Sequence, residues 1–116
     1  SAYWEVVIPT GAVFTGATLD VYFRQAAATT GDVVFAAKTL TRAEGEAWDT
    51  AGNTDAFAAE TVPGTAGWVG MVSKALTVTG WAAGEVLMVG LDRTATDAGD
   101  TLAEDCKVIY AVLRLT

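Results

Sequence analysis

The sequence predicts an all-β fold, an antiparallel β-sandwich of about seven or eight strands. Short segments in which apolar and polar residues alternate follow one another along the chain, and turns rich in Gly, Thr and Asp separate them. A period of two is typical of a strand that turns one face to a core. The 3.6-residue repeat of amphipathic helices is poorly represented, which favours sheets over helices.

Seven segments carry the strand pattern, and they cover residues 3–8, 17–24, 33–42, 56–62, 68–79, 85–92 and 107–115. The first stops at Pro9. In the second, Leu19, Val21 and Phe23 share one face, and polar residues occupy the other. A Gly-Asp turn at 31–32 separates the second segment from the third.

The later segments are bounded in the same way. Residues 43–55 are polar and contain glycine, so we expect a long loop there. The fourth segment ends at a Pro-Gly pair, and the fifth is rich in Val, Thr and Met. The sixth is almost continuously apolar. The best helical candidate is a single turn over residues 100–106, which Asp100 or Thr101 would cap.

Length and cysteine content indicate one domain that spans residues 1–116. A chain of 116 residues can bury one continuous core without disulfides or metals. Cys106 is the one cysteine, so no disulfide forms within the chain. Its place at the start of a strand-like segment favours a buried, unreactive thiol.

The charge balance argues against two classes of partner. The chain has 14 acidic and 7 basic residues, and the basic residues are scattered singly. Without a basic stripe we expect no nucleic-acid binding and no adsorption to an anionic membrane. Apolar stretches also fall short of the roughly 20 residues that cross a bilayer.

Two of the expected strands are apolar on both faces. In residues 107–115, alternation places Ile109, Ala111, Leu113 and Leu115 on one face and Val108, Tyr110 and Val112 on the other. The strand that contains Met88 behaves similarly. An antiparallel sandwich strand normally shows one face to water. We therefore expect neighbouring subunits to cover the second face, with interface candidates Val108, Tyr110, Val112 and Met88.

Residue types that enzymes use are scarce, so we expect no catalytic site and no cofactor. The chain has no histidine, one cysteine and two serines. This excludes Ser–His and Cys–His nucleophile pairs and histidine-containing zinc sites. The glycine fingerprints of nucleotide-binding loops are also absent. No two carboxylates are paired by their spacing as a glycosidase requires.

The most distinctive segment is the acidic loop over residues 92–105. Its carboxylates suit a calcium ion, although the spacing differs from that of a helix–loop–helix calcium site. The alternative, which we favour, is a loop that Arg93 staples through Asp97, Asp100 or Asp105. In that case the remaining aspartates cap turns.

Two of the four tryptophans lie in loop-like segments. Trp48 and Trp81 would form a platform on which a sugar ring stacks. Tryptophans of small sandwiches more often fill a core or an interface, and this alternative stays open.

The order of several segments resembles a known group of proteins. These segments are ATLDVYF at 17–23, GDVVF at 31–35, GEVLMV at 84–89, LDR at 91–93 and DTLAED at 100–105. They resemble virion proteins of tailed bacteriophages with a jelly-roll-like sandwich, which serve as capsid decoration proteins, head fibres or tail-fibre tips. The resemblance covers most of the chain, and the stretch after LDR is its most specific part.

The resemblance implies a jelly-roll-like sandwich that forms a homotrimer at the virion surface. Its partners would be copies of itself and the major capsid or other virion proteins, and the group has no shared catalytic residues. We therefore expect a structural virion protein. The alternative is a carbohydrate-binding module or a receptor-binding fibre tip that contacts a cell-surface glycan.

Overall fold

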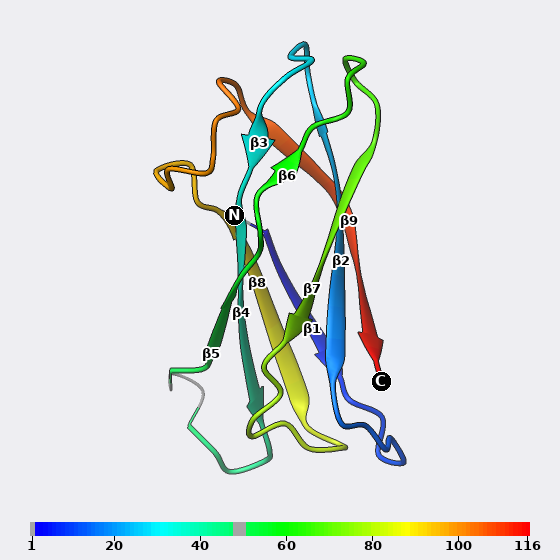
Figure 1. The fold of residues 1–116 in the computed structure, drawn as a ribbon. Helices are drawn as coiled ribbons and strands as arrows, with labels where there is room; N and C mark the ends of the chain where they lie inside the picture. Colours follow the sequence, from blue (N-terminus) through cyan, green and yellow to red (C-terminus); the bar gives the residue numbers. More distant parts are fainter. Residues whose placement is uncertain (1, 48–50) are drawn as a thin grey trace.

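The structure, a computed structural model, describes residues 2–47 and 51–116, and every regular element in these ranges is a β-strand (Figure 1). The strands are β1 Ala2–Val7, β2 Ala17–Gln25, β3 Asp32–Val33, β4 Phe35–Arg42, β5 Asn53–Ala56, β6 Glu60–Thr61, β7 Gly70–Leu76, β8 Val86–Arg93 and β9 Cys106–Leu115. The all-β prediction is therefore confirmed. In the described ranges no helix is long and apolar enough to cross a membrane.

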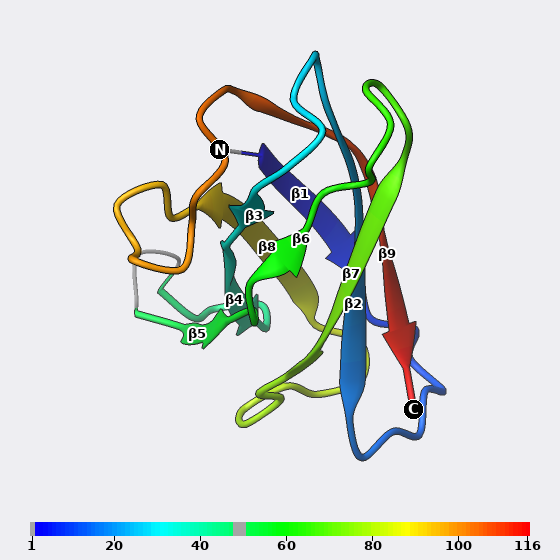
Figure 2. The ribbon, with the colours of Figure 1, turned by 45° about the horizontal axis from the view of Figure 1, so that its top comes forward.

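Two main sheets face each other (Figure 2). One has the strand order β1-β8-β4-β5, the other has the order β7-β2-β9, and β3 and β6 form a small third sheet. Neighbouring strands are antiparallel throughout. This order gives a sandwich-like fold, while the jelly-roll topology stays a prediction.

The core lies between the two main sheets and is a single apolar cluster. The inward side chains of β2 and β8 are almost fully buried, because both are central strands with covered faces. Phe35 links the layers through its ring, whose centroid lies 5.6 Å from that of Phe23 and 6.3 Å from that of Phe57. Gly70 has no side chain, and a Cβ there would clash with the Phe23 ring.

Three local expectations are wrong. The long strand expected over residues 33–42 breaks at Val34, whose N–H and C=O bond to Asp100 and Thr94 of the acidic loop. Residues 53–55, expected in a loop, form the edge strand β5 together with Ala56. The helical turn expected over 100–106 is absent, because Thr101 and Leu102 instead donate backbone hydrogen bonds to Asp32.

A β-bulge in β9 changes which residues face the core. Tyr110 pairs with Tyr22 of β2, but Phe23 pairs with Val108, so Ile109 is the extra residue. A bulge shifts the phase of alternation by one position. Val108 therefore packs against the core together with Ala111 and other inward residues. The expectation that Val108 shares a face with Tyr110 is wrong for this reason.

Candidate functional site

Arg93, the last residue of β8, clamps the acidic loop onto the sandwich. Its Nε donates to Asp100 Oδ2 at 2.9 Å, and its Nη2 donates to Asp100 Oδ1 at 2.6 Å. Nη1 and Nη2 also donate to the carbonyl oxygens of Glu104 and Leu102. The Asp100 side chain is only 1% exposed. Hydrogen bonds from Arg93 hold its pKa below the ordinary value, and a bond from the Val34 N–H adds to this.

Of the three expected partners Asp97, Asp100 and Asp105, Asp100 forms the ion pair with Arg93. Asp97 instead accepts a hydrogen bond from the N–H of Gly99 at 2.7 Å, so it closes a turn. Within the described ranges Asp105 forms no hydrogen bond to Arg93. The clamp is thus a bidentate ion pair, the strongest geometry available to a guanidinium.

Glu104 is a second anchor of the same loop that sequence reasoning missed. Its Oε1 accepts hydrogen bonds from the N–H groups of Ala27 at 3.0 Å and Ala28 at 2.7 Å. These bonds lower the pKa of Glu104. The donors are backbone groups more than 70 positions away, so no residue pattern signals them. Across residues 2–47 and 51–116, no group of three or more His, Cys, Asp or Glu side chains could hold a metal ion.

The outward face of sheet β7-β2-β9 carries an apolar and aromatic surface. Tyr22 and Tyr110 stack with ring centroids 4.4 Å apart and an interplanar angle of 15°. Met71 lies beside Tyr22 in register, and Val112 follows Tyr110 on the same face. Tyr110 is 51% exposed, Met71 45% and Val112 37%. We refer to these four residues as the aromatic face.

Charged residues flank the aromatic face. Arg24 and Lys107 pair in register at one end, and both are exposed. Near the other end Arg114 donates to Asp20 Oδ2 at 2.8 Å and to Oδ1 at 3.0 Å, and the Ser73 hydroxyl donates to Oδ1 at 2.5 Å. The Arg114 and Ser73 bonds lower the pKa of Asp20. The outward charges of this sheet are three basic and one acidic, a net +2 on a chain of net −7.

The four expected interface residues do not share one surface. Tyr110 and Val112 belong to the aromatic face. Val108 points inward because of the bulge. Met88 lies on the other main sheet, where it lines a shallow depression of about 450 Å³ with Tyr3 and other residues. A single interface therefore cannot include all four.

The sugar-platform residues are placed only in part. Trp48 lies outside the described residues. Trp81 is partly buried and packs against the core. It also borders a cavity of about 140 Å³ that Thr39, Arg42 and Asn53 help to line. Trp81 Nε1, Thr39 Oγ1 and Arg42 Nε are buried and have no hydrogen-bond partner among the described residues.

Comparison with known proteins identifies no relative: no family model, no curated protein and no solved structure matches this chain.

Proposed function

We propose that this protein is a structural component that works by assembling with copies of itself rather than by catalysis. The aromatic face is the observation that carries the proposal. Large apolar side chains scattered singly on a surface are ordinary, but a row of two stacked tyrosines, a methionine and a valine is a contiguous patch. Protein interfaces are enriched in such residues at their centre, with polar residues around them.

The charges around the aromatic face favour a head-to-tail arrangement. Two copies that met through the same face would place two surfaces of net charge +2 against each other. The rest of the chain is strongly acidic, so the face is complementary to another surface of a second copy. Head-to-tail contacts generate rings where the rotation closes. A homotrimer is the smallest such ring.

The proposed setting is the surface of a tailed-bacteriophage virion, as a capsid decoration or fibre protein. The support is the resemblance of the segments at 17–23, 31–35, 84–89 and 91–105 to proteins of that group. A particle surface also gives an assembly module a reason to present several copies at once, because multivalent contact strengthens weak individual contacts. Major capsid or other virion proteins would be the second partner.

The glycan alternative is supported by the small polar cavity beside Trp81. Its lining includes Thr39, Arg42 and Trp81, whose side chains carry hydrogen-bond donors or acceptors of the kind that pair with sugar hydroxyl groups. A glycan array tests this alternative. Binding that Arg42→Ala removes would support it, and an array without binders would refute it.

Sedimentation velocity of two matched variants tests the assembly proposal. Tyr110→Ser removes half-exposed aromatic surface from the aromatic face, whereas Val13→Ser changes a loop residue that is 96% exposed and lies elsewhere. We expect Tyr110→Ser to weaken association by about tenfold or more, because interface tyrosines contribute strongly. Val13→Ser should associate like the wild type. Equal effects of the two changes would refute the aromatic face as the interface.

A further inference from the structure

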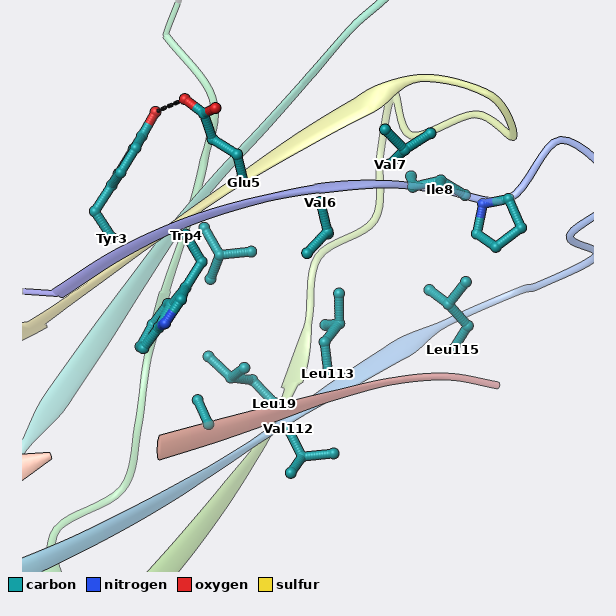
Figure 3. Close-up of a pocket in the computed structure, with 13 residues that line it drawn as sticks. Tyr3, Trp4, Glu5, Val6, Val7, Ile8, Leu19, Val112, Leu113 and Leu115 are labelled. Atoms are coloured by element: carbon teal, nitrogen blue, oxygen red, sulfur yellow. Dashed lines mark hydrogen bonds between the residues drawn. The ribbon is translucent and has the colours of Figure 1, made fainter. Parts of the chain in front are cut away.

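An apolar groove opens along one side of the sandwich, between the edge strands β1 and β9 (Figure 3). Its volume is about 750 Å³. Trp4 and Val6 point into it from β1, and Leu113 and Leu115 point into it from β9. Leu19, from the middle strand of the second sheet, lines its floor. Val112 borders both the groove and the aromatic face, but its side chain points away from the groove in Figure 3.

Inward side chains of the edge strands that line the groove are more exposed than the inward side chains of the central strands. Inward residues of the central strand β2, such as Leu19 and Phe23, are at most 3% exposed. The inward residues of β9 are all only partly buried. Val6 is 45% exposed although it points between the sheets. The described chain therefore leaves this part of the interior uncovered.

The opposite side of the sandwich is closed. There the edge strand β5 is tied to the chain that follows β7: Asn53 donates to the carbonyl of Thr77 at 3.0 Å, and Asp55 accepts from the N–H and hydroxyl of Thr77 at 2.9 and 2.8 Å. Within the described ranges no hydrogen bond joins β1 to β9. One side of the sandwich is thus closed, and in the part of the chain that the structure describes the other side has two unpaired strand edges.

The two free edges suit one inserted strand. Among residues 2–47 and 51–116, β1 pairs only with β8 and β9 only with β2, so each has a row of backbone groups without a strand partner there. Both strands run in the same direction in Figures 1 and 3. A segment between them can therefore run antiparallel to both, which is the more stable pairing. β1 has six residues, so a segment of about six residues would span its edge.

The lining fixes the chemistry of the occupant. Among the described lining residues Glu5 is the only charged one. It points away from the groove and accepts a hydrogen bond from the Tyr3 hydroxyl at 2.9 Å. The groove interior is therefore apolar, in a chain whose net charge is −7. An occupant would present apolar side chains at alternate positions inward and carry neutral or basic residues outward.

A second copy of the chain is a poor source of this segment. In the described ranges the strongly alternating segments, such as β2 and β8, are already paired inside a sheet. To insert one of these strands into the groove of another copy, the donor copy would have to remove it from its own sheet and unfold. We propose that the groove between β1 and β9 receives an extended, uncharged or basic segment of a different polypeptide as an added β-strand. This inference goes beyond self-assembly and does not depend on it.

A designed peptide tests the proposal on the full chain. The probe is a fluorescent form of acetyl-KTVTVTATVK-amide, with binding followed by anisotropy and with hydrogen exchange of the β1 and β9 amides as a second readout. We expect saturable binding and slower exchange at both edges. A peptide with proline at two central positions should not bind, because proline removes ladder donors. Equal binding of the proline peptide would overturn the proposal.

Two adjacent valines give a matched pair of variants. Val6 points into the groove, and Val7 points away from it and is 63% exposed. Val6→Arg should weaken peptide binding by about tenfold or more, and Val7→Arg should change it by less than about twofold. Leu115→Lys, on the facing strand, repeats the test where Val6→Arg does not fold. No saturable binding below about 1 mM, or equal loss in the groove and control variants, would overturn the proposal.

Discussion

Arg93 and Asp100 form a bidentate ion pair that fixes the acidic loop to the end of the sandwich, with Nη2 and Nε of the arginine 2.6 and 2.9 Å from the two carboxylate oxygens. The pair is mostly removed from water, because Arg93 is 19% exposed and the Asp100 side chain 1%. Asp100 also accepts a hydrogen bond from the N–H of Val34, the residue that separates β3 from β4. The Asp100 carboxylate therefore connects the acidic loop both to the end of β8 and to the chain between β3 and β4.

Replacement of Asp100 should be the most damaging single change in this loop. Asp100→Asn leaves the Arg93 guanidinium without its counter-charge, and loss of one partner of a mostly buried pair costs about 3 kcal/mol. Asp97→Asn is the matched control, because Asp97 is exposed and forms a local turn bond to Gly99. We expect it to cost less than about 1 kcal/mol. Urea unfolding measures both, and similar losses would contradict the assigned role of the ion pair.

The same ion pair predicts a pH dependence of stability. Arg93 lowers the pKa of Asp100 below its ordinary 3.8, so the pair stabilises the folded state fully above that value. The contribution is lost as the pH falls through the lower, folded pKa. The free energy of unfolding of wild type minus that of Asp100→Asn should thus be constant above about pH 5 and shrink below pH 3.8. A difference that stays constant down to pH 2.5 would contradict this sign.

Charge around the aromatic face should govern association. Lys107→Glu reverses a basic residue at its rim, whereas Lys38→Glu makes the same change on the other main sheet. We expect Lys107→Glu to weaken association by about threefold or more, with Lys38→Glu close to the wild type. About 0.5 M NaCl should weaken the wild type in the same direction, because salt screens exposed charges. Sedimentation velocity gives all three comparisons, and association that is insensitive to charge and salt would contradict the head-to-tail arrangement.

Cys106 should react slowly in the folded chain. Burial raises the pKa of its thiol from 9.0 to about 11, and the inward direction of the side chain agrees with this. At pH 8 the thiolate fraction is then about a hundredfold lower than in the unfolded chain. Reaction with a chromogenic disulfide in buffer and in concentrated urea measures the ratio. Equal rates in the two solvents would show that the thiol is accessible.

Period-two alternation predicts the central strands well from the sequence. β2 and β8 lie within one residue of their expected bounds. Burial of one or both faces of a strand requires apolar residues at alternate or successive positions, and this pattern is visible in the sequence. β5 has the polar sequence NTDA, and its strand conformation depends on pairing with β4. Such an edge strand gives no local signal.

The candidate functional surfaces were less predictable, since they depend on contacts between residues far apart in the sequence. The sequence pointed to Tyr110 and Val112, but the bulge at Ile109 that turns Val108 inward depends on the register against β2. Likewise, Trp4 and Val6 look like ordinary inward residues. Only the spatial meeting of β1 and β9 leaves them beside an open groove.

The molar mass of the full chain in solution tests the central claim most directly. The monomer has a mass of 12.0 kDa. Sedimentation equilibrium at about 50 µM, well above the dissociation constant of a stable oligomer, should give a multiple of that mass, with three copies as the expected number. A mass of 12.0 kDa at every concentration up to that value would contradict the proposal that this protein functions by assembly with copies of itself.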